Sequence, residues 1–109
     1  MIATLLGAAS PAQGAVFRAS DDGGCWRASG DLTFANADVA LAAAQALPLP
    51  STGVVQCDGI TAVDSAAVAL LLSLKRHGAE RGRPLTFVEM PPALKALAEL
   101  YDVGDILGA

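Results

Sequence analysis

The chain has 109 residues, a size that predicts one compact domain. Hydrophobic residues make up 53% of it and charged residues 17%, which excludes intrinsic disorder because a disordered chain has the opposite balance. The formal net charge of −4 argues against nucleic acid as a partner, since phosphate backbones attract basic proteins. No apolar run approaches the ~20 residues that a membrane-spanning helix needs, so no direct membrane insertion is expected.

The N-terminal residues are apolar but do not fit a secretory signal, because no basic residue precedes the apolar stretch. We expect residues 1–13 to form a loosely docked segment, followed by a single domain over residues 14–109. The two cysteines, Cys25 and Cys57, show no CxxC spacing, so neither a zinc site nor a disulfide is expected. These features favour a cytoplasmic protein.

The first half of the chain predicts two strands and a helix. Residues 14–19 and 25–29 are short strand candidates, and the Asp- and Gly-rich stretch between them favours a hairpin. The chain is then expected to leave the sheet at Gly30–Thr33. An alanine-rich helix follows over residues 35–47, ended by the prolines after it. Its apolar stripe is predicted from three residues spaced four apart, Val39, Ala43 and Leu47.

The second half repeats a strand–helix pattern. A buried strand is predicted over residues 54–57, closed by a turn at Asp58-Gly59. The longest helix is predicted over residues 64–81, with Asp64 or Ser65 as its N-cap and Gly82 at its end.

A further strand over residues 85–88 leads to a last helix opened by Pro91-Pro92. Its apolar face is predicted from Leu94, Leu97, Ala98 and Tyr101, after which Ile106-Leu107 folds back onto the core. The order β-β-α-β-α-β-α predicts an α/β fold with about four strands in a mostly parallel sheet and helices packed on it.

The sequence offers no catalytic constellation. Ser65 and His77 fall on one predicted helix about 18 Å apart, which excludes them as partners in a triad. No phosphate-binding loop or calcium loop is present, so no catalytic residue, cofactor or metal is expected. His77 is predicted to lie on the surface. Four basic residues form a cluster between Lys75 and Arg83. We favour the interpretation that this cluster is a solvated helix end, rather than a docking patch for an acidic surface or lipid headgroups.

The start of the longest predicted helix is the most informative place for function. A helix N-terminus presents free N–H groups and the positive end of the dipole, so Ser65 is chemically suited to phosphorylation. Capping is the commoner reason for such a residue. Helical phase places one stripe outward, and Val68, Leu71 and Ala79 inward. The outward stripe is predicted to contain Ser65, Ala69, Leu72 and Arg76.

Residues 54–74, VVQCDGITAVDSAAVALLLSL, resemble the central signature of the STAS domain, found in anti-sigma factor antagonists and in sulfate transporter tails. The resemblance extends over residues 14–107. The sequence resembles the MlaB-type branch of this family more closely than the other branches. The helix start of that branch is similar to VDSAAVALLL, and its last helix and tail are similar to residues 95–107. This branch supplies the cytoplasmic STAS subunit of a phospholipid ABC transporter.

The resemblance implies a non-catalytic subunit that docks on the transporter's ATPase, with a permease and a lipid-binding subunit in the full complex, and supports outer-membrane lipid asymmetry. Such a subunit would be cytoplasmic and peripheral to the inner membrane. It implies an interface at the helix start, where Asp64 and Ser65 supply polar contacts. The small Ala66 and Ala69 would permit close approach of the partner, and Leu72 and Arg76 would extend the same surface.

An alternative follows from the other branch, a regulator switched by serine phosphorylation. Anti-sigma factor antagonists carry D-S-S-G and are modified on the second serine, but that position is Ala66 here. Ser65 takes the place of the threonine typical of the MlaB-type branch, and Ala67 that of its glycine. A nucleotide- or lipid-binding module is a third possibility that no motif supports.

Overall fold

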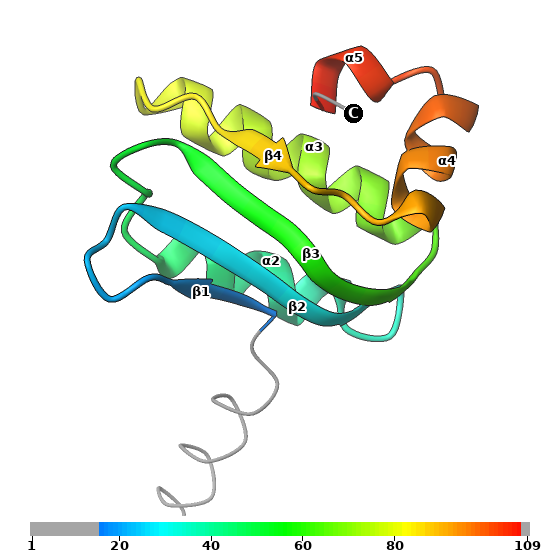
Figure 1. The fold of residues 1–109 in the computed structure, drawn as a ribbon, viewed down its shortest axis with the longest axis horizontal. Coiled ribbons are helices and arrows are strands. Elements are labelled where there is room, and N and C mark those ends of the chain that lie inside the picture. The colour runs from blue at the N-terminus through cyan, green and yellow to red at the C-terminus, as the bar shows by residue number, and fades with distance from the viewer. Residues whose placement is uncertain (1–15, 108–109) are drawn as a thin grey trace, which may run out of the picture.

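The computed structural model describes residues 16–107, which form one sheet with helices packed against it (Figure 1). The strands β1 (Phe17–Ala19), β2 (Cys25–Leu32), β3 (Val54–Val63) and β4 (Thr86–Val88) lie in the order β1-β2-β3-β4. The helices are α2 (Ala37–Ala46), α3 (Ser65–Glu80), α4 (Pro92–Leu100) and α5 (Gly104–Leu107). The predicted α/β class and four-stranded, mostly parallel sheet are confirmed. The segment predicted over residues 1–13 lies outside the described residues.

The sheet contains one antiparallel and two parallel pairings. β1 runs antiparallel to β2, as the hairpin prediction requires, while β2–β3 and β3–β4 are parallel. The hairpin turn is fixed by Asp22, whose carboxylate accepts hydrogen bonds from Ser20 Oγ (2.7 Å) and the Gly24 amide (2.8 Å). Because parallel strands need crossovers, α2 and α3 pack on the sheet as the connections.

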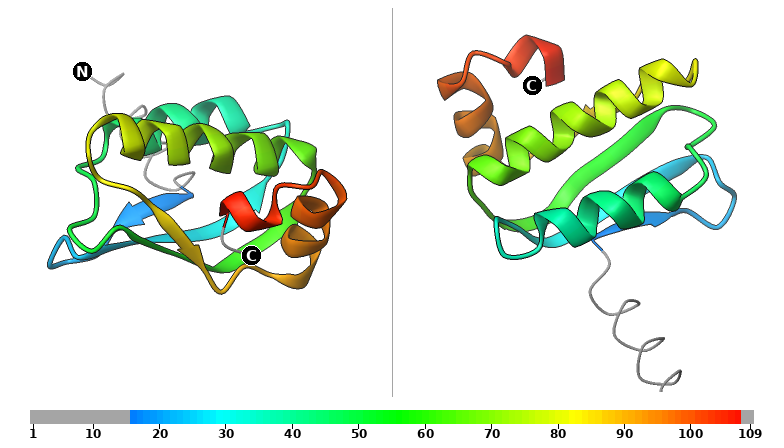
Figure 2. Two further views of the ribbon diagram at one scale, coloured as in Figure 1. Left: turned by 90° about the horizontal axis from the view of Figure 1, so that it is seen from above. Right: turned by 180° about the vertical axis from the view of Figure 1, so that it is seen from behind.

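One face of the sheet is covered by α2 and α3 and holds the core (Figure 2). Alternating residues of β2 and β3 point to this face, so Trp26 and Val55 are buried while their neighbour Arg27 is exposed. Trp26 lies with its ring 6.2 Å from that of Phe17, and its indole N–H donates to the Pro48 carbonyl (2.9 Å). The chain just after α2 is thereby tied to the core at Pro48.

The predicted turn at Asp58-Gly59 is wrong, because β3 continues through both residues to Val63. A Cβ on Gly59 would lie 2.9 Å from the Ala28 carbonyl oxygen, so glycine here allows β2 to approach rather than allowing the chain to turn. The register between the two strands shifts at this place. The predicted exit at Gly30–Thr33 is also wrong, since β2 stays in the sheet as far as Leu32.

The apolar stripe predicted for α2 is wrong, because a different side of the helix is buried. Ala40 and Ala44 face the core, whereas Val39 is 69% exposed and Ala43 is exposed. Almost every residue of α2 is apolar, so its periodicity contains little information about which side becomes buried.

The last turns of α3 also differ from expectation. Val68 and Leu71 are buried as predicted, but Ala79 is exposed. Seven residues bring an α-helix back to within about 20° of the same direction, so the buried row through Leu71 reaches Gly78 instead. His77, predicted on the surface, is only 8% exposed and continues a second buried row. That row contains Leu70 and Leu74.

Candidate functional site

The start of α3 is fixed by Asp64, which acts as the predicted N-cap. Its Oδ1 accepts a hydrogen bond from the Ala66 amide (2.9 Å), and its Oδ2 accepts one from the Phe34 amide (3.1 Å). One carboxylate therefore satisfies a free N–H of α3 and ties the β2–α2 loop to the helix start. A phosphate on Ser65 would stand beside this negative charge, which opposes a second anion there.

A groove opens over the first two turns of α3, with a volume of about 410 Å³. We call it the α3 groove. Its walls include two exposed aromatic side chains, Phe34 (75% exposed) from the β2–α2 loop and Tyr101 (50% exposed) from the end of α4. Among residues 16–107, no charged side chain lines it. The lining residues are Phe34, Ser65, Ala66, Val68, Ala69, Leu72, Tyr101 and Val103.

A second groove of about 280 Å³ runs on the other side of Phe34, between α2 and α3. We call it the α2–α3 groove. Phe34, Ala66 and Ala69 line both grooves, so the Phe34 ring stands as a ridge between them. Asp38 is the single charged residue that the described part of the chain contributes to its lining. The remaining lining residues are Ala37, Leu41, Leu70 and Ser73.

Four of the six sequence-predicted site residues line the α3 groove together: Ser65, Ala66, Ala69 and Leu72. Ser65 and Leu72 are partly buried and Ala69 is exposed, whereas Ala66 is buried. Asp64 lies at the edge as the helix cap. Arg76 is exposed one turn beyond Leu72 and lines neither groove.

Phe34 was not among the site residues predicted from the sequence, and Tyr101 was predicted on the core side of the helix that Pro91-Pro92 opens. α4 ends before Tyr101 because Asp102 adopts a left-handed backbone (φ 59°), and Val103 N then donates to the Ala98 carbonyl (2.9 Å). Tyr101 is consequently turned away from the buried Leu94 and towards the groove. A lone aromatic in a loop gives no periodic signal, so Phe34 could be found only from the tertiary structure.

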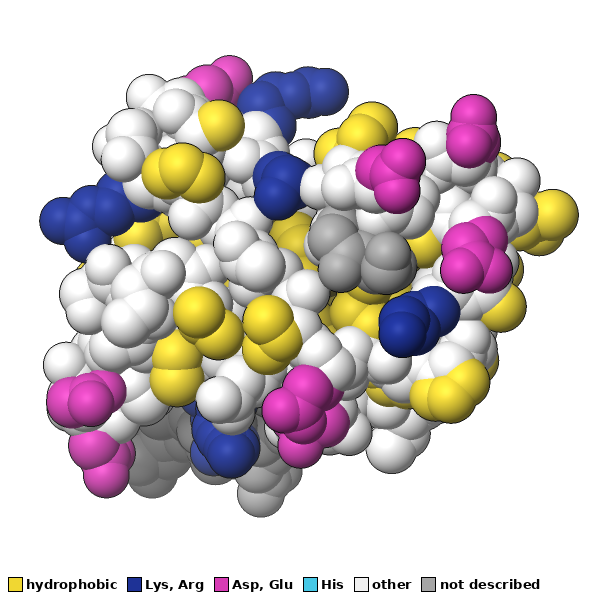
Figure 3. All heavy atoms as spheres, turned by 45° about the horizontal axis from the view of Figure 1, so that its top comes forward, with side chains coloured by type: hydrophobic (Ala, Val, Ile, Leu, Met, Phe, Trp, Pro, Cys, Tyr) yellow, Lys and Arg dark blue, Asp and Glu magenta, His cyan; other side chains and the backbone are white. Residues whose placement is uncertain are grey.

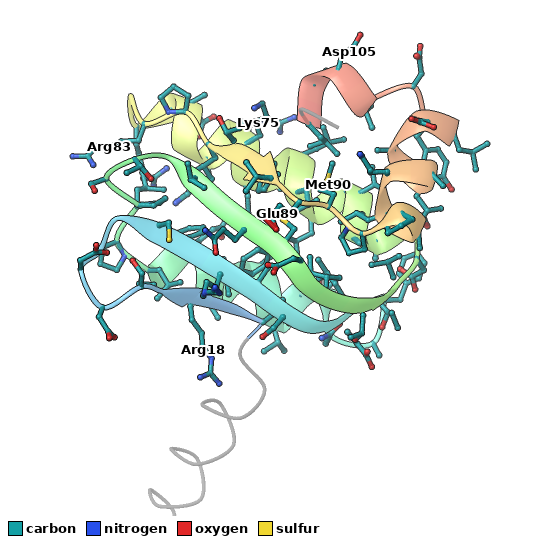
Figure 4. The ribbon with its side chains drawn as sticks, viewed as in Figure 1. Arg18, Lys75, Arg83, Glu89, Met90 and Asp105 are labelled. Atoms are coloured by element: carbon teal, nitrogen blue, oxygen red, sulfur yellow. The ribbon has the colours of Figure 1, made fainter. Side chains whose placement is uncertain are left out.

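Charged side chains lie at both ends of the domain. At the α4–α5 end, acidic and hydrophobic side chains such as Glu99, Leu100 and Asp105 are interspersed, with a basic side chain among them (Figure 3). At the other end, Arg83 projects from the loop after α3 (Figure 4). The basic cluster is not wholly solvated, because Lys75 Nζ donates to the Leu85 carbonyl (2.7 Å) and is partly buried.

Other kinds of site are not formed by the part of the chain that the structure describes. Among residues 16–107, no group of three His, Cys, Asp or Glu side chains comes together to hold a metal ion. Within the same range, no helix has the length and apolar character to cross a membrane.

Cys25 and Cys57 are both free thiols. Burial and, to a lesser degree, the charge of Asp58 raise the pKa of the Cys57 thiol to about 12, so it stays protonated and unreactive at neutral pH.

The comparison with curated proteins finds no match. A protein-family model described as "Mlab, STAS domain" matches residues 15–108, nearly the whole chain. STAS domains mediate protein–protein interactions, which agrees in kind with an open apolar groove. The chain belongs to the MlaB-type STAS domain family.

Proposed function

We propose that this protein is a non-catalytic subunit that docks on the ATPase of an ABC transporter moving phospholipids, and so supports outer-membrane lipid asymmetry. Membership of the MlaB-type family supports this proposal. In this function the protein works in the cytoplasm, held at the inner membrane through the transporter. A permease and a lipid-binding subunit complete the complex.

The observation that carries the proposal is the α3 groove, with its small, apolar floor and two exposed aromatic walls. Ala66 and Ala69 present little side-chain volume, so a partner can approach the helix closely. Exposed aromatic side chains beside such a surface are typical of interface anchors. Ser65 lies at the rim of the same surface and provides a polar contact for the partner.

The test is binding of the purified protein to the candidate ATPase, with Ala69→Arg as the disruptive variant. Ala69 is exposed in the groove, so the arginine leaves the core intact but brings an unpaired charge to an apolar interface. We expect affinity to fall at least about tenfold. Ser65→Glu, which adds a charge next to Asp64, should also weaken the complex.

The matched control is Ala43→Arg, which makes the same change at an exposed alanine of α2 that lines neither groove. This variant should bind like the wild type. If Ala69→Arg and Ser65→Glu bind the ATPase as tightly as Ala43→Arg, the docking site is wrong. If tagged protein instead co-purifies with a serine kinase that phosphorylates Ser65, the regulatory alternative replaces the transporter function.

A further inference from the structure

Phe34 combines high exposure with a fixed backbone, which is unusual for a loop residue. Its ring is 75% exposed and forms the ridge between the two grooves. The loop around it is tied by Asn36, because Thr33 N donates to Asn36 Oδ1 (2.9 Å) and Asn36 Nδ2 donates to the Asp31 carbonyl (2.7 Å). A loop whose main chain is held before binding loses less conformational freedom when a partner packs on its aromatic side chain.

Asp64 connects this ridge to the helix that forms the groove floor. Its Oδ2 accepts from the Phe34 amide at 3.1 Å, across 30 residues of sequence, while Oδ1 caps α3 through Ala66. Both carboxylate oxygens are therefore engaged within the chain. A hydrogen bond to an ionised acceptor is stronger than a neutral one, so Asp64 is suited to hold a loop amide.

We propose that Asp64 is a positioning residue, which fixes Phe34 as the aromatic anchor of the docking surface and acts on the partner through Phe34. This inference rests on the proposed function and specifies its site. It also defines the partner's chemistry. The residues flanking Phe34 in the α3 groove are uncharged, so the partner segment that packs there presents apolar side chains. Any basic group on that segment belongs on the opposite side of Phe34, facing Asp38.

The capping and the positioning roles of Asp64 can be separated by Asp64→Ser. Serine is as good an N-cap as aspartate, but its single hydroxyl oxygen replaces only the contact to Ala66 and leaves the Phe34 amide without its acceptor. The variant should therefore fold, with only a modest loss of thermal stability because the Phe34 contact is exposed to water. Phe34→Ala removes the anchor itself, and the double variant tests whether the two residues act together.

We expect Phe34→Ala and Asp64→Ser each to weaken ATPase binding, the former at least about tenfold. The double variant should bind no more weakly than Phe34→Ala alone, because Asp64 has no anchor left to position. A matched control is Thr61→Ala, which removes another exposed hydrogen bond across 30 residues, from Thr61 Oγ1 to Asp31 Oδ1 (2.8 Å). Additive losses in the double variant would mean that Asp64 contacts the partner directly, which overturns the proposal.

Amide hydrogen exchange gives a readout that needs no partner. In Asp64→Ser the Phe34 amide should exchange several-fold faster than in the wild type, while amides in the middle of α3 keep their exchange rates. In the Thr61→Ala control the Phe34 amide should exchange at the wild-type rate. An unchanged Phe34 exchange rate would refute the positioning role. If the wild-type protein binds no ATPase, the proposed function fails by itself, and the exchange rates still decide whether Asp64 holds Phe34.

Discussion

Gly78 lies in the last turn of α3, where alanine would ordinarily stabilise a helix by about 1 kcal/mol. At this position, however, a Cβ would lie 2.5 Å from the Arg83 carbonyl oxygen and 2.9 Å from Leu85 Cγ. The main chain of Arg83 cannot move away freely, because its amide donates to the Gly78 carbonyl (2.8 Å) in the turn that ends the helix. We therefore expect Gly78→Ala to destabilise the protein.

The magnitude follows from two opposing terms. Inserting a methyl group into a filled space costs about 1–3 kcal/mol, and the upper part of that range applies because the obstacle is main chain. Subtracting the propensity gain leaves a net loss of about 1–2 kcal/mol in the free energy of unfolding. For a domain of this size, each kcal/mol lowers Tm by about 4–8 °C.

Urea and thermal denaturation followed by circular dichroism would measure this loss. Ala79→Gly is the matched control, since Ala79 is exposed in the same turn and should lose only the propensity term, about 1 kcal/mol. A Gly78→Ala protein at least as stable as the wild type would refute the steric reasoning, and would mean that the loop after α3 adjusts at little cost.

Three further predictions concern single residues. Asp102→Gly should stabilise the protein by about 0.5–1 kcal/mol in urea denaturation, because Asp102 adopts the left-handed backbone (φ 59°) that favours glycine. Burial, and then the charge of Arg81, lowers the pKa of His77 below its model-compound value of 6.5. The unfolded state therefore binds a proton more readily, and stability should fall as pH drops through about 6.5, less so in His77→Gln. A thiol reagent near neutral pH should label one cysteine, Cys25, in the native protein and both in denaturant, since Cys57 is buried with its pKa raised to about 12.

For each of these three predictions, the opposite result would contradict the physical reason given for it. A less stable Asp102→Gly protein would mean that the aspartate makes a stabilising interaction that outweighs its backbone strain. Equal pH dependence of stability around pH 6.5 in the wild type and His77→Gln would contradict the role of His77, because a carboxylate such as Asp22, whose pKa is lowered by hydrogen bonds from Gly24 and Ser20, affects stability only at lower pH. Equal labelling rates for the two native thiols would contradict the burial of Cys57.

The sequence alone determined the kind and order of most elements, because their signals are local. Asp64 at an N-cap position, Gly82 after the long helix and Pro91-Pro92 before the last helix each fix a boundary through the conformation of a few neighbouring residues. The outward direction of Ser65 and Ala69 could be predicted as well, since the helical repeat near a fixed start accumulates little error.

Only the tertiary structure decided features that depend on contacts between distant segments. In α2 the uniform apolar composition left the buried side undetermined, and packing placed Ala40 and Ala44 inward. Gly59 lies within a strand, where a Cβ would be 2.9 Å from the Ala28 carbonyl oxygen of β2. No local sequence pattern indicates this close approach. The ridge at Phe34 arises in the same way, since its amide is held by Asp64 from 30 residues away. Local signals specify the backbone conformation of a few residues, whereas the shape of a surface depends on which segments the folded chain brings together.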